Sequence, residues 1–274
     1  MVTVSGLKSV CAFLPSAAIA ALIGCGGGGH SQPPAHAGTQ STAIPRAPRA
    51  LSAQLTAADS ALRHSISSAA SSGRAPLGHL PRAVTTQALY VQRAARLLAR
   101  RPRLEAATVS RLPSRLGYGV RSMTATLRDL DRLSAGWPSR RVVIGPPDPL
   151  GRLLRYYHLA ERRFGVRWQV LAAINLVESA FGRLRSKSVA GARGPMQFLP
   201  ATWRSFGLGG DINDPRDAIL GAANLLRHDG APANYARALY AYNPSPAYVD
   251  AIRRYAELMA HDRDALYLLY SWRP

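Results

Sequence analysis

The sequence predicts an all-α protein, and three observations support this fold class. Apolar side chains recur at three- and four-residue spacing in segment after segment. Proline stands at the start of several of these segments and glycine just past their ends, which is the usual punctuation of helices. No run of alternating Val, Ile or Thr is long enough for a strand of a real sheet.

Residues 1–24 have the pattern of an export signal. Lys8 precedes an apolar run from Val10 to Gly24, which suits a signal-peptide core and is too short to span a bilayer comfortably. The run ends in Leu-Ile-Gly before Cys25, the pattern of a bacterial lipoprotein box. We therefore expect Cys25 to become a lipidated first residue at the outer face of the cytoplasmic membrane. The alternative is an ordinary secretory signal followed by an incidental cysteine.

The chain between this signal and residue 150 divides into a tether, a helical region and a linker. Residues 25–50 are rich in Gly, Pro, Ser, Thr and Ala, which is typical of a flexible tether. Residues 51–136 are expected to form a small helical region of unknown role, and residues 137–149 a Pro/Gly linker. The helices expected in that region are Leu51 to Ala70, Arg82 to Arg101 and Val120 to Leu133.

Residues 150–262 form a second unit, large enough to bury a core of its own. Its expected helices are Leu150 to Phe164, Trp168 to Phe181, Ala201 to Phe206, Arg216 to His228, Ala233 to Ala241 and Pro246 to about Asp262. Residues 263–274 are expected to be a C-terminal tail.

The net charge of +20 is unevenly distributed. Residues 26–147 contain 17 Arg and 4 acidic residues. Residues 148–274 contain 17 basic residues, counting Arg and Lys together, and 11 acidic residues. No helix-turn-helix, zinc-finger or RNA-binding pattern accompanies the basic residues, so we expect no nucleic-acid partner. For an exported lipoprotein, anionic cell-wall polymers or lipids are the charged partners to expect.

Glu178 is the most informative residue, because it lies in an otherwise apolar helical segment. The predicted buried stripe is formed by Val170, Ile174, Val177 and Phe181. Glu178 lies at its margin, in the last turn before Gly182. The negative end of the helix dipole and the apolar neighbours both disfavour the ionised carboxylate. The position predicts either a catalytic general acid or a core-margin glutamate paired with an arginine such as Arg183 or Arg193.

Four short motifs follow one another in this second unit. They are Glu178-Ser179, the segment Ser188 to Phe198 with Gly194-Pro195-Met196-Gln197, the run from Asp217 to Leu226, and Ala241-Tyr242-Asn243. Their order and spacing resemble the catalytic domain of soluble-type lytic transglycosylases, lysozyme-like enzymes that cut peptidoglycan. The resemblance covers about residues 149–261, and nothing before residue 137 takes part.

The resemblance implies cleavage of the β-1,4 bond between N-acetylmuramic acid and N-acetylglucosamine. In this family one glutamate protonates the glycosidic oxygen and then removes a proton from the sugar's own C6 hydroxyl, which leaves a 1,6-anhydro product. It implies Glu178 as acid and base, and Ser179, Ser188, Met196, Gln197, Tyr242 and Asn243 as accessory or substrate-binding residues. The hydroxyl of Tyr242 is expected to point at Glu178. Pro195 stands where leucine is commoner, which bears on the subgroup.

Other interpretations stay open. A goose-type-like lysozyme would hydrolyse the bond with a positioned water, and a non-catalytic peptidoglycan-binding lipoprotein would use the same cleft for recognition. A polymer binder that acts through its basic charge is a third alternative. Ser179 and Gln197 would equally suit the fixing of turns through backbone hydrogen bonds. The aromatic residues Trp168, Trp203, Tyr235, Tyr240 and Tyr248 are interpreted as core side chains rather than sugar platforms.

The sequence predicts no metal site and no cofactor. Asp211, Asp214 and Asp217 superficially suggest a calcium loop, but the glycine and glutamate expected at its sixth and twelfth positions are missing. We interpret these aspartates as helix-capping residues, although folding could bring one of them to Glu178 as a second carboxyl group.

Overall fold

The computed structural model describes residues 43–71, 80–134 and 142–272. The predicted fold class is confirmed, because these residues form 11 helices and no β-strand. In chain order the helices are α2 (Pro48–Ser71), α3 (Arg82–Ala99), α4 (Pro102–Val109), α5 (Ser114–Ser134), α6 (Leu150–Phe164), α7 (Trp168–Ser179), α8 (Pro200–Phe206), α9 (Pro215–His228), α10 (Tyr235–Tyr242), α11 (Pro246–His261) and α12 (Ala265–Tyr270).

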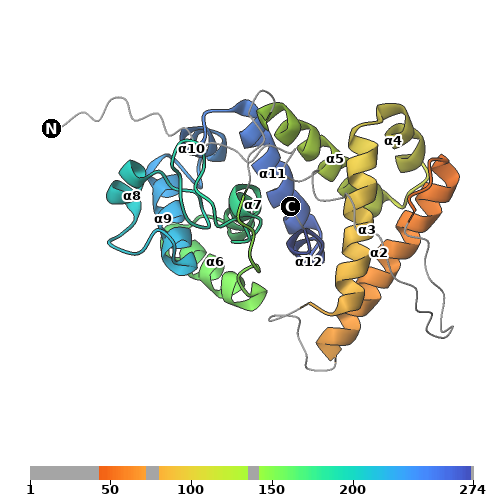
Figure 1. Ribbon diagram of the computed structural model, residues 1–274, viewed down its shortest axis with the longest axis horizontal. Helices are drawn as coiled ribbons and strands as arrows, with labels where there is room; N and C mark the ends of the chain where they lie inside the picture. Colours follow the sequence, from red (N-terminus) through yellow and green to blue (C-terminus); the bar gives the residue numbers. More distant parts are fainter. Residues whose placement is uncertain (1–42, 72–79, 135–141, 273–274) are drawn as a thin grey trace, which may run out of the picture.

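The helices form two groups that share one core. Helices α2 to α5 lie at one end of the molecule and α6 to α10 at the other, with α11 and α12 between them (Figure 1). Helix α11 packs against α5 and against α7, while α12 packs against α3. A single cluster of buried apolar side chains runs through both groups, from Leu51 to Trp272. The N-terminal helices are therefore packed onto the unit that contains Glu178.

Ion pairs accompany this apolar contact. Asp129 of α5 is buried and pairs with Arg254 of α11 and with Arg132 of its own helix. Arg63 of α2 donates to Asp264, 2.8 Å away, and also to Asp262, at the junction of α11 and α12. Burying a charge is costly unless it is paired, so these pairs fix where the two groups of helices meet.

Helix α7 runs through the middle of the second group and is buried on nearly all sides. Nine of its 12 residues are buried, so it has no single apolar stripe. The sequence placed Glu178 at the margin of such a stripe, with Val177 inside it. In the structure Glu178 is buried and Val177 is partly exposed, because α6, α9 and α11 all contact this helix.

The predicted helices are present, with differences at their ends. Helix α7 ends at Ser179 rather than at Phe181. Helix α5 begins at Ser114 instead of Val120, and α4 forms where a break was expected, because Pro102 occupies the first turn of a new helix. The segment expected as a C-terminal tail contains α12, whose Leu269 and Tyr270 are buried.

The predicted signal peptide, Cys25 and most of the tether to residue 50 lie outside the described residues, as does the first part of the 137–149 linker. Among the helices that the structure describes, none has the length and apolar character needed to cross a membrane.

Candidate active site

Glu178 lies at the end of a helix that stops abruptly. Glu178 is only 5% exposed, and α7 ends one residue later, at Ser179. The next three residues all have positive φ angles: 51° at Ala180, 61° at Phe181 and 80° at Gly182. Two of these three are not glycine, so the turn occupies a backbone region that side chains disfavour. The surrounding contacts must hold it in place.

The burial of Glu178 changes its acidity. Desolvation raises the pKa of the carboxyl from 4.5 to about 8, and a hydrogen bond from Tyr248 partly opposes this shift. At neutral pH the group is therefore mostly protonated, as a general acid requires. The predicted alternative was an ion pair with an arginine. Arg183 instead donates to the carbonyl oxygens of Ala180 and Tyr270, each at 2.9 Å, and Arg193 is exposed.

The tyrosine that donates to Glu178 is Tyr248. Its hydroxyl lies 2.9 Å from Glu178 Oε1, and the residue is fully buried in the first turn of α11. The hydroxyl of Tyr242, the expected donor, instead donates to the carbonyl oxygen of Met196 at 2.7 Å. The two rings stack, with centroids 6.3 Å apart and planes within 5°. Tyr242 thus supports both Tyr248 and the Met196 backbone.

Ser245 sets the position of Tyr248. It is the N-cap residue of α11, and its side chain accepts a hydrogen bond from the Tyr248 backbone amide at 3.4 Å. Asn243 precedes this cap and is buried, with its backbone amide bonded to the carbonyl of Leu239 at 2.9 Å. The motif around Asn243 therefore makes the turn from α10 into α11 that brings Tyr248 to Glu178.

A tight turn between Arg193 and Phe198 lies against the end of α7. Ser179 donates to the carbonyl oxygen of Pro195 at 2.6 Å, and Asn175, one helical turn earlier, donates to the same oxygen at 2.8 Å. Ser179 is fully buried. These hydrogen bonds to backbone atoms match the interpretation in which Ser179 fixes a turn. The turn that it fixes lies next to Glu178.

Gln197 and Met196 belong to this turn. Gln197 has a φ of 46°, is 3% exposed and donates from Nε2 to the carbonyl of Gly194 at 2.9 Å. Gly194 lies so close to Ile212 that a Cβ atom there would be 1.9 Å from the Ile212 oxygen. The motif glycine is therefore required by close backbone approach as well as by its positive φ.

Ser188 and the aspartates stabilise loops. Ser188 accepts from the amide of Ala192 at 2.9 Å and so closes its own turn. Asp214 caps α9 through the amide of Asp217 at 3.0 Å, and Asp217 accepts from the amide of Asp211 at 3.1 Å. This is the capping role predicted from the sequence. Among the described residues, no three His, Cys, Asp or Glu side chains come together as metal ligands.

Two contacts at the candidate site were not predicted from the sequence. Tyr248 was interpreted as a core aromatic, and the only signal that favoured it was its place in the first turn of a proline-started helix. Asn175 was not considered, although it lies four residues before Ser179, so that both face the same side of α7. Its Oδ1 accepts from the buried Tyr157 hydroxyl at 2.6 Å, which orients its amide toward Pro195.

Part of the chain matches a known protein family. Residues 155–261 match the Transglycosylase SLT domain family, and Glu178, Gln197 and Tyr248 all lie inside the matched region.

The chain is also similar to a membrane-bound lytic murein transglycosylase F from Thiobacillus denitrificans (strain ATCC 25259 / T1). The two are 33% identical over 124 residues, which is 42% of this chain and 26% of that protein, so the chain spans about a quarter of its relative's length. No solved structure matches the chain.

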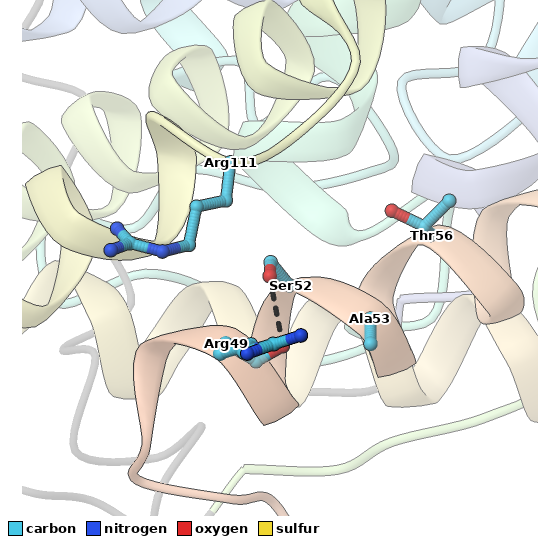
Figure 2. A pocket seen from close by; sticks show the side chains of 5 residues that line it. All are labelled: Arg49, Ser52, Ala53, Thr56 and Arg111. Carbon is cyan, nitrogen blue, oxygen red and sulfur yellow. Dashed lines mark hydrogen bonds between the residues drawn. The ribbon is translucent and has the colours of Figure 1, made fainter.

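A pocket of about 600 Å³ lies at the opposite end of the molecule, between the start of α2 and the segment after α4. It is lined by Arg49, Ser52, Ala53, Thr56 and Arg111 (Figure 2). Arg49 and Arg111 approach it from opposite sides in that view, and both are exposed. This pocket is basic and contains no acidic side chain.

Proposed function

We propose that the protein is a lytic transglycosylase that cleaves the β-1,4 glycosidic bond between N-acetylmuramic acid and N-acetylglucosamine in peptidoglycan. The SLT domain supports the class of activity. The observation that carries the proposed mechanism is Glu178: a buried carboxyl group with a pKa of about 8 that accepts a hydrogen bond from the Tyr248 hydroxyl.

In the first step, neutral Glu178 gives its proton to the glycosidic oxygen as the bond from that oxygen to the sugar's C1 breaks. The N-acetylglucosamine side leaves as an alcohol, and positive charge develops on the muramic ring. In the second step, the ionised Glu178 accepts the proton of the C6 hydroxyl while that oxygen bonds to C1. The product is a 1,6-anhydro ring, and Glu178 is neutral again, so no water is consumed.

Tyr248 suits the interval between these steps. Its hydroxyl donates to Glu178 Oε1 and favours the ionised form that exists after the first proton transfer. We propose that Met196 and Gln197, held in their turn against α7, form the floor beneath the sugar, and that Ser188 and Asn243 shape the loops around it. Ser179 acts through the backbone of that turn.

Product analysis tests the reaction. Digestion of purified peptidoglycan should release muropeptides that end in 1,6-anhydromuramic acid and have no reducing end. Reducing-end products would instead identify a goose-type-like lysozyme. The matched variant is Glu178→Gln, which keeps the shape of the side chain but has no proton to transfer, and it should release no product while retaining binding to the polymer. A wild-type protein that binds without cleaving would be a peptidoglycan-binding lipoprotein.

We also propose that lipidated Cys25 holds the exported protein on the outer face of the cytoplasmic membrane. The lipoprotein-type sequence before Cys25 supports this, and the relative from Thiobacillus denitrificans is named a membrane-bound enzyme. Metabolic labelling with a fatty acid should mark the wild-type protein and not Cys25→Ser. Equal labelling of both proteins would contradict the proposal.

The basic pocket supports an anionic cell-wall polymer as a second partner. Arg49 and Arg111 line it, and the first turn of α2 beside it has no acidic residue. Guanidinium groups bind phosphate and carboxylate oxygens in pairs. Binding of the full chain to polyphosphate should weaken with salt and fall in a double Arg49→Gln, Arg111→Gln variant, compared with a double Arg155→Gln, Arg204→Gln variant as a charge-matched control, since both of these arginines are exposed. Equal loss in the control would indicate non-specific charge attraction.

A further inference from the structure

The left-handed turn after Glu178 is held by segments that lie outside the matched SLT domain. Residues 143–148 run antiparallel to residues 181–185, with Ile144 bridged to Leu184. The amide of Asp148 donates to the carbonyl of Phe181 at 3.0 Å, and the amide of Gly145 donates to the carbonyl of Arg183 at 2.8 Å. This extended segment therefore pairs with the backbone of the turn and of the residues after it.

The C-terminal helix closes the turn from the other side. The Tyr270 hydroxyl of α12 donates to the carbonyl of Asp148 at 2.8 Å, and its ring packs on Phe181 with centroids 5.4 Å apart. Arg183 donates to the carbonyls of Ala180 and Tyr270, each at 2.9 Å, and lies over the Tyr270 ring at 5.3 Å. Tyr270 thus contacts Phe181, and Arg183 contacts Ala180.

Gly182 shows how closely the parts fit. It has a φ of 80°, and a Cβ atom there would lie 2.3 Å from Asp148 Oδ2. Ala180 and Phe181 reach similar angles without the freedom of glycine, so the turn needs these contacts to persist. Because Glu178 lies only two residues before Ala180, any relaxation of the turn would move its carboxyl relative to Tyr248.

The N-terminal helices hold α12 in turn. Gln92 of α3 donates to the carbonyl of Leu268 at 2.6 Å, and Arg96 of α3 lies over the ring of Trp272 at 4.3 Å. Leu269 and Tyr270 are buried between these helices. The region with no role assigned from the sequence therefore supports the helix that closes the turn.

We propose that Tyr270 and Arg183 are positioning residues that hold the left-handed turn and thereby keep Glu178 in register with Tyr248. This inference rests on the proposed function, since it concerns the same carboxyl group. It gives α12 and α3 a part in the reaction, although both lie outside residues 155–261.

Two conservative variants test the proposal. Tyr270→Phe removes only the hydroxyl that donates to Asp148, and Arg183→Lys keeps the charge but loses the planar group that reaches two carbonyls. Each should lower kcat on peptidoglycan about tenfold with little change in KM, because a misplaced acid slows the chemical step. The matched control is Tyr267→Phe, one helical turn earlier on α12, where the side chain packs against both buried apolar clusters, including the one that contains Leu62.

A second readout does not depend on cleavage. The chain has only four glutamates, so carboxyl-labelled glutamate allows Glu178 to be titrated by ¹³C NMR. A loosened turn admits water, which lowers the pKa of Glu178, and weakens the Tyr248 hydrogen bond, which raises it. Burial is the larger of these two effects, so the titration midpoint of Glu178 should fall by about one unit in Tyr270→Phe and Arg183→Lys and stay unchanged in Tyr267→Phe.

The outcomes separate the two proposals. A wild-type protein that does not cleave peptidoglycan would overturn the proposed function, while the titration would still judge the positioning role. If both variants keep the wild-type kcat and the wild-type Glu178 midpoint, the positioning role is wrong, even if their melting temperatures fall. Circular dichroism of each variant confirms that it is folded before either measurement is made.

Discussion

The hydrogen bond from Tyr248 to Glu178 makes a quantitative prediction. Replacing Tyr248 with phenylalanine removes the hydroxyl 2.9 Å from Oε1 and leaves the ring stacked on Tyr242. A hydrogen bond to a charged group contributes about 1.5–3 kcal/mol, which corresponds to about 1–2 pKa units. Because this bond lowers the pKa of Glu178, its loss should raise that pKa above about 8.

The assay is the pH dependence of peptidoglycan cleavage. A general acid must be protonated, so activity falls as pH rises through its pKa. In Tyr248→Phe this fall should move to higher pH, while the maximal kcat drops about 10- to 100-fold, because the carboxylate needed in the second step loses its partner. Tyr240→Phe is the control, because this tyrosine of α10 is exposed. A shift of the Tyr248→Phe profile to lower pH, or an unchanged kcat, would refute the reasoning.

Three further predictions concern stability. Between pH 4.5 and about 8 the unfolded chain ionises Glu178 while the folded chain keeps it protonated, so the free energy of unfolding falls as pH rises. Glu178→Gln should therefore raise the free energy of unfolding by about 3 kcal/mol near neutral pH and by little at pH 4. Chemical denaturation at both pH values measures this difference. Asp129→Ala removes a buried acceptor from Arg132 and Arg254, but both arginines reach solvent and Arg254 keeps Asp250, so it should cost only about 1–2 kcal/mol, measured in the same way. Gly194→Ala should lower the melting temperature far more than Gly191→Ala, because only the first Cβ meets the Ile212 backbone.

Local sequence patterns predicted the helices of the second unit well. Proline starts and glycine ends locate α6, α8 and α9 within a residue or two, because these signals act through the backbone of the residue itself. The end of α7 was placed two residues late. Ala180 and Phe181 adopt left-handed angles that neither side chain favours, and they do so because Tyr270 and Asp148, distant in sequence, hold the turn.

The chemical character of Glu178 was predictable, and its partner was not. An acid among apolar residues indicates burial from the sequence alone, and burial dominates its pKa. The choice between Tyr242 and Tyr248 depends on which hydroxyl faces α7 after two helices pack. Both tyrosines are buried and stacked, so composition and spacing do not distinguish them.

The proposed use of one carboxyl group for two opposite proton transfers requires its pKa to change during the reaction. Before cleavage, burial keeps Glu178 neutral. As positive charge develops on the sugar ring, a nearby carboxylate is favoured by Coulomb attraction, which is strong in a site of low polarity. The Tyr248 hydroxyl favours the same ionised form. Once the C6 oxygen closes the anhydro ring, the positive charge is gone and burial again favours the neutral acid, so Glu178 regains a proton from the C6 hydroxyl. The substrate's own charge therefore switches the group between acid and base, which explains how a site with one buried carboxyl group and one tyrosine would complete the cycle.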